Sequence, residues 1–215
     1  MHNPTVIETM ITPAATADLI DLPTLKTLLA ITTADQDAYL ALIISQMSAA
    51  AARYCNRVFA VETVLNSFWG QRDGYPVALR GAAPPLQLSR QPIQTIVSVF
   101  ETVSGTPMPL TAAVDYLIDP GKGWLYRLDT NGYPAKWQPH AVAVTFSAGF
   151  AVIPVDVVGA IAAWVKAVQA AQTQNPLLRS MRLPGVIEAT YSVGGVSMPI
   201  ETSAVLDSYK IINIG

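Results

Sequence analysis

The stretch that decides the fold is VAVTFSAGFAVIPVDVVGAIAAW, residues 142–164. It begins with the alternation of a β-strand and reaches Gly149, a residue free to take backbone turns that others resist. Pro154 then suits the first turn of a helix, and Asp156 in that turn faces the positive end of the helix dipole. The stretch therefore predicts the last strand of a β lobe, followed by an apolar helix over about residues 154–172.

A second long helix is predicted upstream, over about residues 34–58. Thr33 and Gln36 have the spacing of a capping box, and a shorter helix before them has Asp21 as its candidate cap. Because both long helices carry an apolar stripe, we expect them to pack on each other. The upstream stripe consists of Leu40, Ile43, Ile44, Met47, Ala51, Tyr54 and Val58.

Between the two helices the periodicity becomes that of short β-strands separated by turns. Residues 120–123 join two of these strands as a hairpin, because proline and glycine favour a tight turn. Pro92 and Pro107 confine their segments to sheet edges or loops, since proline cannot donate a backbone hydrogen bond. This region predicts an antiparallel β lobe inserted into the helical part.

Together these patterns predict an α+β protein: a small helical bundle with an inserted antiparallel β lobe and an extended C-terminal tail. The tail contains VLDSYKIINI, residues 205–214, which is too apolar to stay free in water. We therefore expect the tail to bind a surface, either the β lobe or a partner. The predicted parts are an N-terminal arm (1–17), a helical lobe (18–59 and 154–175), a β lobe (60–150) and the tail (176–215).

The composition limits the class of protein. Charged residues make up 13% of the 215 residues, against about 25% in a typical soluble domain. This leaves two explanations: an alanine-rich protein with a neutral polar surface, or a surface covered by other subunits. The net charge of −2 gives no basic field for nucleic acid. The N-terminus lacks a secretory pattern, and no apolar run reaches the ~18 residues of a membrane span, so we expect a soluble, non-exported chain.

Signatures of catalysis are weak throughout. The sequence has no phosphate-binding loop, dinucleotide fingerprint, metal-spaced Cys/His cluster or nucleophile elbow, so no cofactor or metal is predicted. Of the two histidines, His2 lies in the arm and His140 precedes a strand as a loop residue. Cys55 is expected to be a small buried residue. The sequence therefore predicts that the protein is not an enzyme.

Two features of the β lobe could imitate a sugar site. Asp115, Asp119 and Asp129 flank the predicted hairpin and could imitate a glycosidase carboxylate pair, although aspartates at strand ends usually form turns. Tryptophans could line a carbohydrate surface, although core and rim packing is the favoured interpretation. The tryptophans are Trp69, Trp124, Trp137 and Trp164.

Two small basic groups remain. Arg53 and Arg57 lie one turn apart at a helix end, and Arg179 and Arg182 lie just before Pro184. They complement a helix dipole or a solvated surface, or they contact an acidic partner or passing DNA. Four arginines do not predict nucleic-acid binding by themselves.

Three segments together resemble a known family. They are the leading and long helices over residues 22–57, the hairpin, strand and Pro-led helix within 115–161, and the segments ATYSVGGVSM and VLDSYKI within 189–211. Their order and spacing resemble the head–tail connector, or adaptor, proteins of tailed bacteriophages and related gene transfer agents. The resemblance spans about residues 20–210.

The resemblance implies a structural virion protein without catalytic activity. Such proteins are made in the host cytoplasm and form a closed head-to-tail ring, commonly of about twelve copies. The ring docks under the portal at the head–tail junction, extends the DNA channel during genome packaging and delivery, and offers a platform for a tail-completion or stopper protein. Contact with passing DNA would be transient and non-specific, and no membrane is involved.

The resemblance and the apolar tail together select candidate partner-binding residues. Tyr209, Ile211 and Ile212 are the expected anchors of the tail, because aromatic and aliphatic side chains dominate interface energetics. The other candidates are Arg53, Arg57, Arg179 and Arg182. Two alternatives to an adaptor stay open: a carbohydrate-binding or hydrolytic module carried by the β lobe, and an oligomeric scaffold unrelated to virions.

Overall fold

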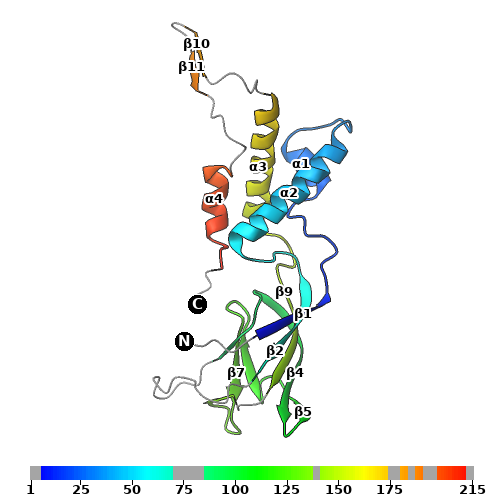
Figure 1. Ribbon diagram of the computed structural model, residues 1–215, viewed down its shortest axis with the longest axis vertical. Helices are drawn as coiled ribbons and strands as arrows, with labels where there is room; N and C mark the ends of the chain where they lie inside the picture. Colours follow the sequence, from blue (N-terminus) through cyan, green and yellow to red (C-terminus); the bar gives the residue numbers. More distant parts are fainter. Residues whose placement is uncertain are drawn as a thin grey trace. The chain divides into compact units, whose positions relative to one another are not determined.

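The computed structural model describes residues 6–69, 85–137, 141–173, 180–183, 187–190 and 198–211. The described chain combines helices with antiparallel sheets (Figure 1), which confirms the predicted α+β class. It divides into two compact units. Within the described residues, the β unit comprises 6–16 and 58–152, and the helical unit comprises 17–57 and 153–211.

The larger sheet of the β unit has five strands in the order β1-β2-β9-β4-β5, and all neighbours are antiparallel. Residues 6–12, from the predicted arm, form its edge strand. Pro107 lies in the other edge strand, as predicted for a residue that cannot donate to a ladder. The strands are β1 (Val6–Thr12), β2 (Glu62–Phe68), β4 (Ile93–Val103), β5 (Thr106–Pro109) and β9 (Val142–Ala148).

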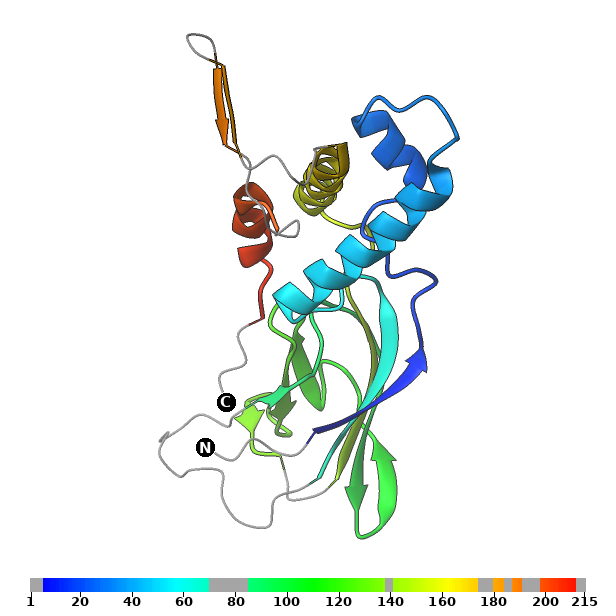
Figure 2. The same cartoon turned by 45° about the horizontal axis from the view of Figure 1, so that its top comes forward.

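The smaller sheet faces the larger one (Figure 2) and has the order β3-β7-β6, with β8 also pairing with β7. Its β6–β7 hairpin turns at residues 120–123, as predicted. Buried side chains of both sheets, including Phe146 and Leu125, form one shared core. The strands are β3 (Leu86–Gln87), β6 (Tyr116–Asp119), β7 (Trp124–Leu128) and β8 (Pro134–Ala135).

Strand β9 ends where the sequence predicts, directly before Gly149. This glycine has φ of +126°, and a Cβ added there would lie 2.3 Å from the carbonyl oxygen of Ala60. No L-residue takes this conformation readily, and no side chain fits the space. Phe150 continues the chain by donating its backbone N–H to the Phe59 carbonyl at 2.7 Å. The turn is therefore fixed by both sterics and hydrogen bonding.

The helical unit contains α1 (Leu22–Leu28), α2 (Asp37–Cys55), α3 (Val155–Thr173) and α4 (Ile200–Asp207). The Asp21 carboxylate accepts the Thr24 N–H at 2.7 Å, which confirms Asp21 as the cap of α1. Helix α3 follows Pro154, whose carbonyl accepts the Val158 N–H at 3.0 Å. Helix α2 packs against α1, α3 and α4.

The predicted start of the long helix is wrong by a few residues. Helix α2 begins at Asp37, and Gln36 occupies the N-cap position without a side-chain capping bond. Asp37 instead pairs with Lys26 Nζ at 2.6 Å, so an ion pair to α1 fixes this end in place of the capping box. At the other end Asn56, in the left-handed region at φ of +48°, stops the helix before Val58.

The interior of the helical unit is apolar. Met47 and Tyr54, expected in the α2 stripe, are only half-buried, and Val58 lies beyond the helix. Helix α3 contributes Trp164, which is 5% exposed. The fully buried or nearly buried side chains of the two helices include Leu40, Ile43, Ile44, Ala51, Val157, Ile161 and Val165.

The sequence predicts an extended tail, but part of the tail is helical. Residues 200–207 form α4, and Thr202 and Leu206, one turn apart, are completely buried. The Thr202 hydroxyl donates to the Ala160 carbonyl of α3 at 3.1 Å. A polar side chain with a partner in α3 and a leucine one turn later favour a packed helix over a strand. Earlier in the tail, β10 (Ser180–Leu183) and β11 (Ile187–Thr190) form an antiparallel pair.

Candidate functional site

The most connected cluster of predicted site residues lies where the segment after α4 meets the C-terminal end of α2. The Tyr54 hydroxyl donates to Asp207 Oδ1 at 2.6 Å, and the Ile211 N–H donates to the Cys55 carbonyl at 2.9 Å. Lys210 Nζ lies 4.2 Å from the centre of the Tyr54 ring, a cation–π contact. We call this cluster, residues 53–57 with 207–211, the α2–tail junction.

Tyr209 connects the junction to the first turn of α3. Its hydroxyl lies 2.8 and 2.9 Å from the two carboxylate oxygens of Asp156, to which it donates. Burial, and next the hydrogen bond to Asp156, raise the pKa of Tyr209 above its ordinary value. Asp156 Oδ1 also accepts the Val157 N–H at 2.9 Å. Tyr209 therefore holds the segment after α4 onto the helical unit, whereas the sequence had offered the β lobe or a partner.

The two arginines of α2 differ in exposure. Arg53 is exposed in the last turn of α2, and Arg57 is half-buried just after the helix. Burial lowers the pKa of Arg57, while Cys55 and Tyr209 act in the opposite direction. The structure thus connects three of the seven candidates, Arg57, Tyr209 and Ile211, in one junction, and Arg53 lies in the adjoining last turn of α2.

The remaining three candidates are not part of this cluster. Arg179 and Ile212 lie outside the described residues. Arg182 lies in β10, opposite Glu188 of β11. The partner roles of all seven residues stay predictions.

Cys55 has the structural role expected of it. Its side chain is fully buried, and Sγ donates to the Leu206 carbonyl at 3.4 Å. Burial raises the pKa of the thiol, which disfavours the reactive thiolate. Cys55 therefore contributes to the packing of α4 on α2 and is a poor nucleophile.

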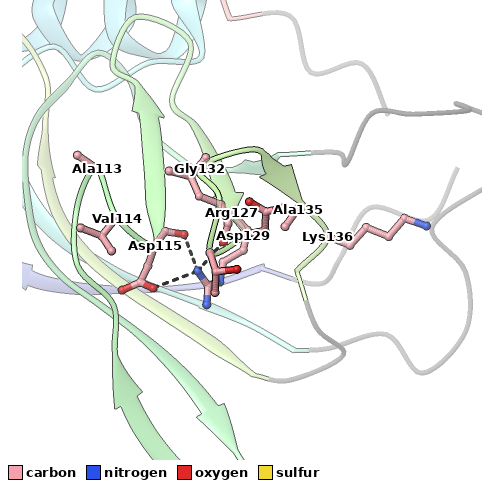
Figure 3. A pocket seen from close by; sticks show the side chains of 10 residues that line it. Ala113, Val114, Asp115, Arg127, Asp129, Gly132, Ala135 and Lys136 are labelled. Carbon is pink, nitrogen blue, oxygen red and sulfur yellow. Dashed lines mark hydrogen bonds and ion pairs between the residues drawn. The ribbon is translucent and has the colours of Figure 1, made fainter.

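The β unit contains an open cavity of about 680 Å³ beside the β6–β7 hairpin (Figure 3). Asp115 accepts the Thr111 N–H at 2.8 Å, and Asp129 Oδ1 accepts the N–H groups of Asn131 and Tyr133 at 2.8 and 2.9 Å. These carboxylates form turns, as does Asp119. The cavity is lined by Ala113, Val114, Asp115, Arg127, Leu128, Asp129, Thr130, Gly132, Ala135 and Lys136.

The one arginine in this cavity wall connects the two sheets. Arg127 Nη1 donates to the Asp115 carbonyl at 2.6 Å, and Nε lies 3.7 Å from Glu101 Oε2. Glu101, on β4, is only 4% exposed, so it needs a positive partner. Arg127 is therefore engaged in holding the sandwich together, and Asp115 and Asp129 of the same wall are engaged in turns.

The tryptophans are mainly packing residues. Trp164 and Trp137 are buried, and Trp137 Nε1 donates to the Leu125 carbonyl at 3.3 Å. Trp124 begins β7 and donates to the Gln87 side chain, while Trp69 follows β2 and is exposed. His2 and His140, the only two histidines of the sequence, lie outside the described residues.

Within the described part of the chain, no three metal-ligating side chains gather at one place, and no helix has the length and apolarity to cross a bilayer. The arrangement that the structure does provide is one of packing surfaces: a two-sheet unit and a helical unit whose last segment is fastened to its own helices.

Comparison with solved structures places the fold among proteins of gene transfer agent (GTA) particles. A chain from the neck of an empty GTA particle, computed with C6 symmetry, has a TM-score of 0.55 at 18% identity, with 97% of both chains covered. A chain from the native GTA virion has 0.55 at 16% identity, and one from the native neck, computed with C12 symmetry, has 0.53 at 17%, both with the same coverage. At these identities the likeness concerns the fold.

The sequence itself matches a family model. Residues 19–100 match the family described as Phage gp6-like head-tail connector protein. The matched range runs through α1, α2 and β2 into β4. A comparison with curated proteins gives no match. The resemblance to head–tail connector proteins inferred from the sequence is confirmed.

Proposed function

We propose that this protein is a structural head–tail connector that sits in the neck of a phage or gene-transfer-agent virion and has no catalytic role. The observation that carries the proposal is the likeness to GTA neck chains over 97% of both chains, combined with the connector family match at residues 19–100. The wall of the β-unit cavity, built from turn-forming carboxylates and an arginine that ties two sheets together, supports a structural role.

The connector forms a closed ring of identical copies, about twelve in number, with head-to-tail contacts. The neck structures similar to this chain were computed with C6 and C12 symmetry, which supports a cyclic assembly. Neighbouring copies also account for the low charge of the chain, 13% of residues, since subunit contacts cover surface that water would otherwise solvate.

The ring docks beneath the portal, extends the DNA channel and presents a platform for a tail-completion or stopper protein. The α2–tail junction is the proposed portal contact. It has the exposed Arg53 in the last turn of α2 and the half-buried Tyr209 and Ile211 in the segment after α4, so that the region contains both a charged group and apolar or aromatic side chains. Passing DNA meets the channel without specific binding, since the net charge of the chain is −2.

The test is co-sedimentation of the purified protein with its own portal, with the number of bound copies counted. A connector binds the portal and forms a ring on it. A free ring without affinity for the portal would support an oligomeric scaffold unrelated to virions. The absence of both ring formation and portal binding would overturn the proposal.

A further inference from the structure

The outer face of the five-stranded sheet is neutral. Register pairs Leu65 with Thr145 and Ser67 with Ala143, and these pairs face away from the core that Val64 and Val144 join. On β1 and β4 the same face carries Ile7, paired with Ser67, and Phe100, paired with Ala143. Among the paired residues on this side of the five strands, all within the described chain, none is charged. We call this surface the neutral face.

The outer face of the smaller sheet is aromatic. Leu125 and Ile118 point into the shared core, so their neighbours Leu117, Trp124 and Tyr126 point outward. Leu117 is 49% exposed and pairs with Tyr126, whose ring centre lies 6.4 Å from that of Trp124. Asp119, which pairs with Trp124, lies on the same side, and Lys122 Nζ lies 4.9 Å from the centre of the Trp124 ring, so charged groups border these three residues. We call Leu117, Trp124 and Tyr126 the aromatic face.

The two faces point in opposite directions, because the sheets share one core between them (Figure 2). A contact between the neutral face of one copy and the aromatic face of the next is therefore head-to-tail, and head-to-tail contacts form a ring where the rotation from copy to copy closes. A two-fold contact between two neutral faces would leave the aromatic face uncovered.

We infer that the ring of the proposed function is built by this contact: the neutral face of each copy packs on the aromatic face of its neighbour. The inference rests on the proposed function and names its self-association surface. Charged residues are depleted and aromatic residues are enriched at the centre of stable interfaces. The uncharged side chains of the neutral face and the rings of the aromatic face match this composition.

The neutral face covers part of the area that a specific interface needs. Strands about 4.8 Å apart that rise about 3.3 Å per residue give five strands of about seven residues a face of roughly 550 Å². Because the aromatic face that it meets is smaller, this contact alone buries less than about 1,100 Å² in total, below the usual size of specific protein interfaces. Further contacts between copies can add to this area.

The experiment places one charge on each face and mixes the variants. Thr145→Glu blocks the neutral face, and Leu117→Glu blocks the aromatic face. Both positions have solvent access, so the variants should keep the wild-type melting temperature. The matched control is Leu42→Glu, a leucine of α2 that is 56% exposed. If Thr145→Glu does not fold, Thr95→Glu replaces it, since Thr95 pairs with Ser147 on the same face.

We expect each face variant to lose ring assembly on the portal at least tenfold, and Leu42→Glu to assemble as the wild type does. Each face variant alone stays monomeric in native mass spectrometry. An equimolar mixture of the two forms 1:1 dimers, because the intact aromatic face of one variant meets the intact neutral face of the other, and growth stops there.

The outcomes separate the two proposals. A wild type that neither forms rings nor binds the portal overturns the proposed function. Rings that form in the wild type and persist in both face variants overturn this inference alone. Loss of assembly without dimers in the mixture also overturns it, because a head-to-tail contact between these faces must pair the two variants.

Discussion

Gly149 has little freedom to change. Alanine there would combine a φ of +126° with a Cβ 2.3 Å from the Ala60 carbonyl oxygen. Backbone strain and overpacking each cost about 1–3 kcal/mol, so Gly149→Ala should lower the free energy of unfolding by about 2–6 kcal/mol. Chemical denaturation measures this difference directly.

The control for that variant is Gly132→Ala. Gly132 has a φ of +79° but nothing within 4 Å of an added Cβ. Gly132→Ala should therefore cost only the backbone strain of alanine at positive φ, about 1–2 kcal/mol. Equal losses at the two positions would contradict the close approach at Gly149.

Glu8 gives the β unit a dependence on pH. Hydrogen bonds from Arg90, at 2.6 and 3.0 Å, lower the pKa of Glu8 below its ordinary 4.5, although partial burial acts in the opposite direction. A depressed carboxyl pKa stabilises the fold above the ordinary value, and the stabilisation is lost as the pH falls through the folded-state pKa. The Glu8 side chain is 31% exposed, so the contribution is about 1 kcal/mol or less.

The measurement compares wild type with Glu8→Gln by denaturation above and below pH 4.5. The stability difference should shrink as the pH falls. In an Arg90→Met background it should no longer depend on pH in this range, and a persisting dependence would assign the effect to another group.

At the scale of elements, the contact between α2 and α3 depends on large buried side chains. Trp164 of α3 is 5% exposed, so Trp164→Ala should cost about 3–5 kcal/mol. Trp69 is 60% exposed, and Trp69→Ala should stay within about 0.5 kcal/mol of the wild type. Thermal melting compares the two variants, and similar losses would remove the packing role assigned to Trp164.

Elements bounded by glycine, proline or other turn residues could be predicted from the sequence. Strand β9 and helix α3 follow from Gly149, Pro154 and a clear change of period, and the β6–β7 hairpin from its turn residues. Helix α4 was missed because eight residues hold only two buried positions, Thr202 and Leu206, too few for a periodic signal.

The candidate site was predictable only in part. Arginines at a helix end and an apolar tail mark the α2–tail junction in the sequence. The bond between Tyr209 and Asp156 joins residues 53 positions apart, and no local pattern reports such a contact. The neutral and aromatic faces likewise need the strand registers, which place alternate residues of each strand on opposite sides of the sheet.

On the scale of the whole molecule, the surfaces proposed for self-association and for portal binding belong to different units. The β unit carries two uncharged or aromatic faces suited to neighbouring copies, and the helical unit carries the junction proposed for the portal. This division predicts that ring assembly and portal binding can be separated by mutation. Deletion of the tail cannot make that separation, because removing residues 203–215 also removes Leu206, which is fully buried.

A single charge reversal at the junction makes the separation instead. Arg53 is exposed in the last turn of α2, so Arg53→Glu should leave the fold intact but place a negative charge where an acidic portal surface is expected. We expect portal binding to weaken at least tenfold, or about 1.4 kcal/mol, in a co-sedimentation titration. Lys166→Glu makes the same charge change at an exposed position of α3 outside the junction and should bind as the wild type does. Equal weakening in both variants would point to a long-range effect of net charge, and unchanged binding of Arg53→Glu would place the portal contact away from the α2–tail junction.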